Sequence, residues 1–268
     1  MWQTPVWAEH LRAGAETVIS QTQNGNLPRL SGISAVFPAF NDGGTIPSMI
    51  LTAILALRQV TDDYEIIVTN DGSSDYTSQV LDEMCLRYPE LRVIHHDRNL
   101  GYGAALRSGF SAATREWIFY TDGDAQYNPL ELINLVAAVR DDVDVVNGYK
   151  ISRSDPLDRK IIGRVYHYLV KWAFGFHLRD VDCDFRLIRR KIFTEIQLES
   201  TTGTLPLEMV KKFQDAGYHF AEVPVHHYFR QYGKSQFFNW RRLLATAIQL
   251  YQLWLKLIIH KENGHSAQ

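Results

Sequence analysis

Short apolar segments, each followed directly by polar and turn-forming residues, recur through the first half of this chain. They lie at 33–37, 64–69 and 117–121. The second, Tyr-Glu-Ile-Ile-Val-Thr, is a near-continuous apolar run. Such a run is typical of a parallel strand that helices cover on both faces, because neither face then meets water.

Helical patterns fill the intervals between these segments. Helices are expected at about 45–59, 77–88, 99–114 and 130–139, and further strands at 91–95 and 143–147. Strands that alternate with helices at this spacing predict βαβ units. The chain is therefore expected to form an α/β fold with a mostly parallel central sheet flanked by helices.

The second half of the chain is less regular. Helices are predicted at about 159–174 and 205–216, strand-like segments at 179–187 and 220–225, and a long terminal helix at about 238–260. The sequence thus divides into an N-terminal leader (1–30), one large domain (31–236), and a C-terminal amphipathic helix with a tail (237–268).

Composition narrows the class of protein and its compartment. A formal net charge of −2 gives no reason to expect nucleic acid as a partner. The two cysteines, Cys85 and Cys183, form neither a disulfide framework nor a zinc motif, which indicates a reducing compartment such as the cytoplasm. No signal peptide is recognisable, and no uncharged apolar stretch reaches the roughly 18 residues of a membrane-spanning helix.

The polar clusters at 38–42, 70–75 and 122–126 all follow predicted strands. Ligands of α/β sheets bind at the carboxyl ends of strands, so this coincidence is the first indication of a functional site.

The cluster after the strand at 117–121 contains Asp122, Asp124 and Gln126. Two carboxylates and an amide oxygen are hard oxygen donors, which suit Mg²⁺ or Mn²⁺ shared with phosphate oxygens. A divalent ion would stabilise the negative charge that develops on a departing diphosphate. The alternative is a turn in which aspartate only caps the backbone. Taken alone, this motif gives the two interpretations about equal weight.

The cluster after the strand at 64–69 reads Asn-Asp-Gly-Ser-Ser-Asp. We expect Ser74 or Asp75 to cap the next helix, and Asp71 to face a ligand, where its carboxylate would accept a hydrogen bond from a base N–H. In the cluster at 38–42, Phe40 offers a ring face and Asp42 a carboxylate, although a simple loop explains this cluster equally well. The glycines at 101–109 are interpreted mainly as sites of tight packing.

Four motifs stand in order along 33–150. They read Pro-Ala-Phe-Asn-Asp, Asn-Asp-Gly-Ser-Ser-Asp, Asn-Leu-Gly-Tyr-Gly and Asp-Gly-Asp-Ala-Gln, the last being a DxD motif. Together they resemble the inverting GT-A-fold glycosyltransferases of family 2, and most of all the dolichyl-phosphate mannose synthase branch and its bacterial polyprenyl-phosphate relatives. The resemblance continues more weakly to about residue 236. It implies a Rossmann-like GT-A fold and a metal-dependent hexosyltransferase.

The resemblance also implies a role for each matching residue. The nucleoside would be held by Pro38, Phe40, Asp42 and Asp71. The diphosphate and its Mg²⁺ or Mn²⁺ would be bound by Asp122, Asp124 and Gln126. An electropositive wall near the phosphates would be formed by Lys150, Arg153 and Arg164. The loop that closes over the donor and meets the acceptor would carry Arg230, Lys234 and Ser235.

Five positions depart from the usual motifs. Asn70 stands where an aspartate is usual, Asp42 where a glutamate is usual, Lys150 in place of an arginine, and Asp184 in place of a glycine. Phe40 also lacks the hydroxyl of the usual tyrosine. These departures leave the base and the sugar open between GDP-mannose and a UDP-hexose.

The expected reaction is inverting transfer of the sugar to a polyprenyl or dolichyl phosphate. A phosphate acceptor is already an anion, so little or no general base is needed, and Arg230 and Lys234 would orient it. If the acceptor is instead a hydroxyl, Asp182 or its neighbour Asp180 is the candidate base. The alternative for these aspartates is pairing with nearby arginines, and it is given equal weight.

The terminal helix is strongly apolar and has aromatic residues along it, so it is expected either at a membrane surface or packed on protein. A cytoplasmic enzyme, peripheral on the cytoplasmic face of a membrane, follows from the first choice, and a homo-oligomer or a membrane partner protein stays open. Rival functions are a glycosyltransferase with a soluble saccharide, peptide or metabolite acceptor, a nucleotidyltransferase, and an inactive nucleotide-sugar-binding module.

Overall fold

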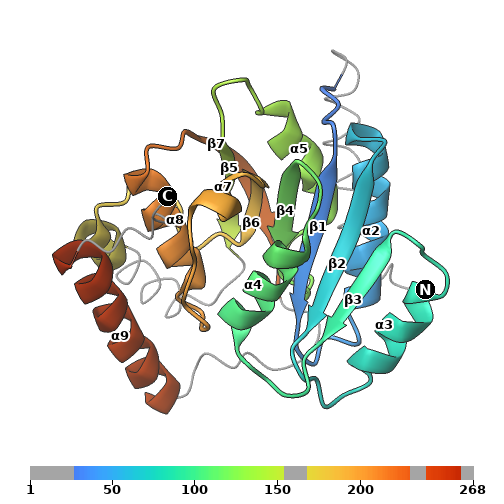
Figure 1. Cartoon of the computed structure of the whole chain (residues 1–268), viewed down its shortest axis with the longest axis horizontal. Coiled ribbons are helices and arrows are strands. Elements are labelled where there is room, and N and C mark those ends of the chain that lie inside the picture. Colours follow the sequence, from blue (N-terminus) through green and yellow to red (C-terminus); the bar gives the residue numbers. More distant parts are fainter. Residues whose placement is uncertain (1–26, 154–167, 230–239, 261–268) are drawn as a thin grey trace, which may run out of the picture.

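The computed structural model describes residues 27–153, 168–229 and 240–260. A seven-stranded sheet runs through its centre, in the order β3-β2-β1-β4-β6-β5-β7 (Figure 1). The strands are β1 (Ile33–Ala39), β2 (Tyr64–Asn70), β3 (Leu91–His95), β4 (Trp117–Thr121), β5 (Val145–Arg153), β6 (Phe185–Arg189) and β7 (Phe220–His227). The first four are mutually parallel, β7 is parallel to β5, and β6 is antiparallel to both of its neighbours. The prediction of a mostly parallel sheet is confirmed.

Helices cover both faces of the sheet. They are α2 (Ile46–Val60), α3 (Thr77–Cys85), α4 (Tyr102–Ala112), η1 (Pro129–Glu131), α5 (Leu132–Ala137), α7 (Ile192–Glu195) and α8 (Leu205–Asp215). Phe37 of β1 packs in the core that α2, α3 and α5 share, whereas its neighbour Val36 packs with α4, α7 and α8. Successive side chains of a strand point to opposite faces, so burial of both faces explains the continuous apolar runs.

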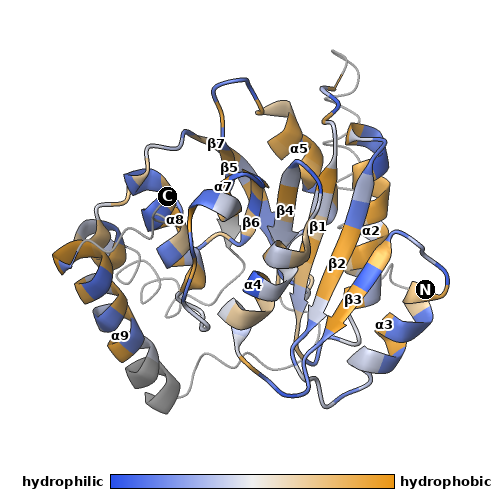
Figure 2. Ribbon diagram, in the orientation of Figure 1, coloured by the Kyte–Doolittle hydropathy of each residue, from blue (hydrophilic) through white to orange (hydrophobic). Residues whose placement is uncertain are grey.

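A third apolar cluster lies beyond α8, and Phe220 of β7 packs against it. It joins the helical segment 168–174, α9 (Trp240–Trp254) and the π-helical turn η2 (Leu255–Ile259) to Leu207 and Val210 of α8. In Figure 1, α9 lies at the outer edge of the molecule, and Figure 2 shows apolar and polar residues mixed along it, as expected for an amphipathic helix.

Several predicted boundaries were wrong. The first strand was expected to end at Pro38 but continues to Ala39, because β2 still pairs with Pro38 after the β4 ladder has stopped at Val36. The strand-like segment at 179–187 begins only at Phe185. The polar residues at the ends of β5 and β7 extend these strands to Arg153 and His227 because the two strands pair with each other.

Candidate functional site

The loops after β1 and β4 meet at the carboxyl ends of their strands. The hydroxyl of Thr45 donates to the carbonyl of Gly123 at 2.8 Å. A Cβ on Gly123 would lie 3.0 Å from the Pro38 carbonyl oxygen and 3.7 Å from Oδ2 of Asp42. Glycine therefore allows the spacer between the two aspartates of the DxD motif to lie against the first loop. The structure thus brings the candidate residues Asp42, Asp122 and Asp124 to one edge of the sheet.

Asp122 is held by Tyr102, whose hydroxyl donates to Oδ1 at 2.7 Å. Burial raises the pKa of the Asp122 carboxyl well above its ordinary value, and the neighbouring carboxylates of Asp184 and Asp124 raise it further. The Tyr102 hydrogen bond acts in the opposite direction. The charged form of Asp122 is therefore disfavoured here, which is typical of a carboxylate that binds a cation or accepts a hydrogen bond from a ligand.

Asp124 is buried, and its Oδ1 accepts a hydrogen bond from the backbone N–H of Gln126 at 3.0 Å. Between them, Ala125 adopts a left-handed conformation with φ of 60°. The Gln126 side-chain amide donates to the carbonyl of Tyr228, and the Tyr228 N–H donates to the carbonyl of Gln126. The DxD loop is thereby fastened to the chain that follows β7.

The oxygen donors at this site suit a cation whose coordination shell is completed by a bound substrate. Within the described ranges, no group of three or more histidine, cysteine or acidic side chains is arranged to hold a metal ion. Asp122 and Asp124 nevertheless supply two carboxylates, and Mg²⁺ is commonly held by one or two carboxylates together with substrate phosphates and water. The neighbouring carboxylates raise the pKa of Asp122, and a bound divalent cation would relieve the repulsion behind this rise.

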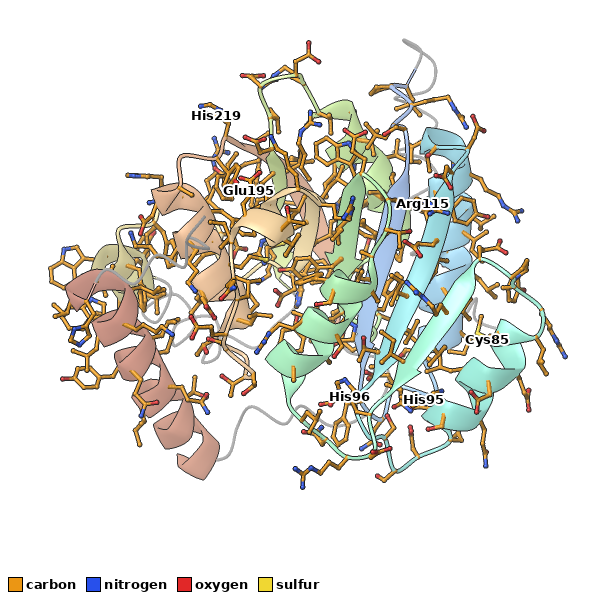
Figure 3. All side chains as sticks on the ribbon, in the orientation of Figure 1. Cys85, His95, His96, Arg115, Glu195 and His219 are labelled. Atoms are coloured by element: carbon orange, nitrogen blue, oxygen red, sulfur yellow. The ribbon has the colours of Figure 1, made fainter. Side chains whose placement is uncertain are left out.

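Asp71, at the end of β2, already has three hydrogen-bond partners. Its Oδ1 accepts from the N–H of Leu100 at 2.9 Å and lies 2.7 Å from Nδ1 of His96. Its Oδ2 accepts from the N–H of Gly101 at 2.9 Å. Figure 3 labels His96 at this edge of the sheet, close to the start of α4. The role of Asp71 toward a nucleoside stays a prediction, and the structure gives the carboxylate a second task.

The loops after β1 and β2 are linked to each other. The side-chain oxygen of Asn41 accepts from the N–H of Ser74 at 2.8 Å, and the N–H of Asn41 donates to the hydroxyl of Ser73. Asp75 accepts from the N–H of Thr77, the first residue of α3, at 3.0 Å, although Tyr76 occupies the N-cap position. Phe40 stays 38% exposed beside these loops, so its ring face is accessible to a planar ligand.

Of the three residues predicted to form the electropositive wall, Lys150 is the one whose side chain the structure describes. Its ammonium group donates to the carbonyl of Asp182 at 2.6 Å and lies 3.8 Å from the Asp180 carboxylate. The Asp180 carboxylate also accepts from the N–H groups of Lys150 and Asp182. Asp180 thus organises the loop before β6, with the ammonium group of Lys150 beside its carboxylate.

Sequence reasoning noted Asp184 only as a departure, and the structure places it beside the DxD motif. The antiparallel pairing of β4 with β6 ends at Thr121 opposite Phe185, so the next residues, Asp122 and Asp184, continue the same register. Oδ1 of Asp184 accepts from the Tyr120 hydroxyl at 3.3 Å and lies 3.4 Å from the fully buried Arg186. The pairing of distant strands, which no local motif encodes, creates this neighbour.

Of the remaining predicted site residues, the structure describes only the backbone position of Arg153. Those outside the described residues are Arg164, Arg230, Lys234 and Ser235. Arg153 ends β5, where its backbone pairs with His227.

Comparison with known proteins places this arrangement in context. Residues 34–197 match the family model described as Glycosyl transferase family 2. The chain is 29% identical over 211 residues to an undecaprenyl-phosphate 4-deoxy-4-formamido-L-arabinose transferase of Yersinia enterocolitica, covering 78% of this chain and 63% of that protein. It is 28% identical over 236 residues to glycosyltransferase AglD of Haloferax volcanii, covering 85% of this chain and 38% of that protein.

Solved structures share the fold. Glucosyl-3-phosphoglycerate synthase of Mycobacterium tuberculosis, in complex with Mn²⁺, uridine diphosphate and glucosyl-3-phosphoglycerate, matches with a TM-score of 0.65 at 19% identity, covering 96% of this chain and 86% of that one. The same synthase with Mg²⁺ and uridine diphosphate matches with a TM-score of 0.63 at 17% identity, covering 95% and 85% of the two chains. The GT-A architecture expected from the sequence is confirmed.

Proposed function

This chain belongs to glycosyl transferase family 2, and from that membership we propose that it transfers a sugar, with inversion, from a nucleoside-diphosphate sugar to a polyprenyl phosphate. The observation that carries the proposal is the pair Asp122 and Asp124 at the end of β4, fastened to the loop that holds Asp42. This pair lies at the strand ends where α/β sheets bind their ligands.

The donor is proposed to lie across the strand ends with its base toward β1 and β2. Phe40 would stack on the base, while the carboxylates of Asp42 and Asp71 would accept hydrogen bonds from the N–H groups of the nucleoside. Asp122, Asp124 and Gln126 would hold Mg²⁺ or Mn²⁺ together with the diphosphate. The bound cation would supply Lewis-acid stabilisation of the leaving diphosphate. Relatives of the same fold that have been crystallised with Mn²⁺ or Mg²⁺ and uridine diphosphate support this arrangement.

The acceptor phosphate is proposed to attack the anomeric carbon in line with the bond to the diphosphate. A new carbon–oxygen bond forms as that bond breaks, and the nucleoside diphosphate leaves with its electron pair. No proton has to be removed from an ionised phosphate, so the chain needs no general base. Arg230 and Lys234 remain our candidates for orienting the acceptor, and Lys150 for the electropositive wall.

The names of the bacterial relatives support a lipid-linked acceptor, because these proteins are undecaprenyl-phosphate transferases. This chain spans slightly less than two thirds of their length, and the acceptor is therefore part of the proposal. No helix among the described residues is long and apolar enough to cross a membrane. Large side chains are nevertheless exposed on the outer helices, which we name the outer apolar surface: Tyr168, Leu169, Trp172, Ile248, Tyr251 and Ile259. We propose that it attaches the enzyme peripherally to the membrane that carries the acceptor.

The test is nucleotide release from a panel of UDP- and GDP-sugars, with Mn²⁺ or Mg²⁺, each with and without a short polyprenyl phosphate. We expect release that depends on both metal and lipid, and at least a roughly hundredfold loss in Asp124→Ala, as for removal of a group that stabilises transition-state charge. Exposed Asp141 provides the matched control, Asp141→Ala, which should keep full activity.

Two outcomes would change the proposal. Turnover without lipid would move the acceptor to a soluble saccharide, peptide or metabolite. If a nucleoside diphosphate binds but no sugar donor is turned over, the transferase proposal is wrong and an inactive nucleotide-sugar-binding module becomes the better interpretation.

A further inference from the structure

Three consecutive residues of one turn contact both halves of the candidate donor site. The N–H groups of Leu100 and Gly101 each donate to the Asp71 carboxylate at 2.9 Å. The next side chain, Tyr102, donates its hydroxyl to Asp122 at 2.7 Å. The aspartate proposed for the base and the first aspartate of the DxD motif are therefore joined through a single turn at the start of α4.

This turn has little room to move away from the sheet. Gly101 has a φ of 103°, which side chains rarely adopt, and a Cβ there would lie 2.4 Å from the carbonyl oxygen of Thr201. The same carbonyl accepts from the N–H of Ala104 at 3.2 Å. A Cβ on Gly103 would lie 2.7 Å from the carbonyl oxygen of Ser200. The turn is thus wedged between the end of β2 and the loop at 199–202.

The loop at 199–202 is itself held by a side chain of α8. Both oxygens of Glu208 accept backbone N–H groups of this loop, from Glu199 at 3.0 Å and from Ser200 at 2.8 Å. Glu208 also lies 2.8 Å from Lys212, and both side chains are buried. The buried pair of Glu208 and Lys212 therefore supports the loop against which the turn rests.

The Asp71 carboxylate is fixed from its other side. His96, which is almost fully buried, lies 2.7 Å from Asp71 and 2.9 Å from the hydroxyl of Ser108. With an imidazole and two backbone N–H groups as partners, Asp71 has one orientation that satisfies all three. This orientation sets the position of the turn and, through it, that of the Tyr102 hydroxyl.

We propose that Tyr102 is a positioning residue for Asp122, and that the turn at 99–102 makes the metal side of the site depend on Asp71. The inference rests on the proposed function and deepens it. The turn of the glycine motif is a rigid link between the two parts of the donor site, and it sets the distance between the bound base and the bound diphosphate. Asp71 then affects cation binding even when no base is present.

The experiment separates the effect of Asp71 that acts through the turn from its direct recognition of the base. The preformed one-to-one complex of Mn²⁺ with pyrophosphate, which has no base, is titrated calorimetrically into the full chain. The variants are Tyr102→Phe, which removes only the hydroxyl, and Asp71→Asn, which disturbs the turn. Tyr88→Phe is the matched control, because Tyr88 loses the same atom beyond α3, far along the chain from the DxD loop. Each protein is used well below its midpoint of thermal unfolding.

We expect Tyr102→Phe to weaken binding of the complex about tenfold, as for loss of a hydrogen bond to a charged group. Asp71→Asn should weaken it at least about threefold, and Tyr88→Phe should leave it unchanged. Gly101→Ala provides a second test of the turn that removes no carboxylate, and it should reproduce the loss.

Unchanged binding in Tyr102→Phe would overturn the positioning role, and unchanged binding in both Asp71→Asn and Gly101→Ala would overturn the link through the turn. The same titration with Mn²⁺ and UDP or GDP distinguishes this failure from failure of the proposed function. If the wild-type chain binds neither nucleotide complex, the donor site itself is wrong and the inference is lost with it. Binding of a nucleotide complex without any binding of the pyrophosphate complex would also overturn the inference.

Discussion

Asp122 is a carboxylate that the fold surrounds with other carboxylates. Asp184 faces it across the ends of β4 and β6, Asp124 follows it in the same loop, and Asp42 also raises its pKa. Tyr102 provides the hydrogen bond that partly compensates. A residue arranged in this way costs stability in the free protein, and such strain is common at functional sites.

Asp122→Asn is therefore predicted to stabilise the metal-free protein at pH 7 while abolishing sugar transfer. A group whose folded pKa is raised destabilises the fold above that pKa, by about 1.4 kcal/mol for each unit. Replacing it by a neutral isostere should raise the thermal midpoint by at least about 2 °C in EDTA. Differential scanning calorimetry checks this result.

The pH dependence gives an independent check on Asp122. Stability of the wild-type, metal-free chain should increase as the pH falls through the raised folded pKa toward the ordinary value of 3.8, because the folded protein then binds a proton that the unfolded chain does not. The contribution should be absent in Asp122→Asn. An asparagine variant that is less stable than wild type would show that the negative charge is a structural requirement.

At the scale of elements, α8 contributes to the site from a distance. Its buried pair Glu208 and Lys212 anchors the loop against which the glycine motif of α4 rests. Burial raises the pKa of Glu208, but hydrogen bonds from Lys212 and Ser200 outweigh it and leave the pKa below the ordinary value. The folded protein thus favours the ionised form of the Glu208 carboxyl.

Glu208→Gln is predicted to reduce the free energy of unfolding by about 3 kcal/mol at pH 7, because it leaves a buried ammonium group without its nearest carboxylate. Urea unfolding measures this change. Asp215→Asn on the same helix is the matched control, since its pair with Lys211 is more exposed and should contribute about 0.5 kcal/mol. Equal losses in the two variants would contradict the special role of the buried pair.

The sign of the pH effect follows from the lowered pKa of Glu208. Its contribution is fully present above the ordinary value of 4.5 and is lost as the pH falls through the folded value. The stability difference between wild type and Glu208→Gln should therefore shrink as the pH falls below 4.5 and through the lowered folded pKa of Glu208.

At the scale of the whole molecule, the outer helices lie at one side of the sheet domain (Figure 1). The inner sides of 168–174 and α9 are joined in one core, and Trp254 donates its indole N–H to the carbonyl of Ala173 at 2.9 Å. Trp172, by contrast, is 86% exposed. Aromatic side chains of this kind are common where proteins meet the membrane interface.

The double variant Trp172→Ala and Tyr251→Ala is predicted to weaken co-sedimentation with vesicles of anionic phospholipid at least about tenfold, since each ring buries a large area in the interface. Leu86→Ala is the matched control, because Leu86 is 88% exposed but lies next to α3. Wild-type chain that does not sediment with vesicles would contradict peripheral attachment through this surface.

Much of this fold could be predicted from the sequence. The runs at 64–69 and 117–121 predicted buried strands, and the turn chemistry at 70–75 and 122–126 marked where they end, because both signals are local. The glycine motif was predicted to pack tightly, and Gly109 does so, since a Cβ there would lie 2.4 Å from Val36.

What the sequence by itself determined is therefore the type of each element, the edge of the sheet that carries the polar residues, and the family. Only the tertiary structure decided that β6 inserts antiparallel between β4 and β5, which places Asp184 opposite Asp122. Only it showed that the turn before α4 joins Asp71 to Tyr102 and Asp122. The physical reason is that strand order and contacts between distant loops depend on packing of the whole chain, whereas hydrophobic periodicity and capping are set within a few residues.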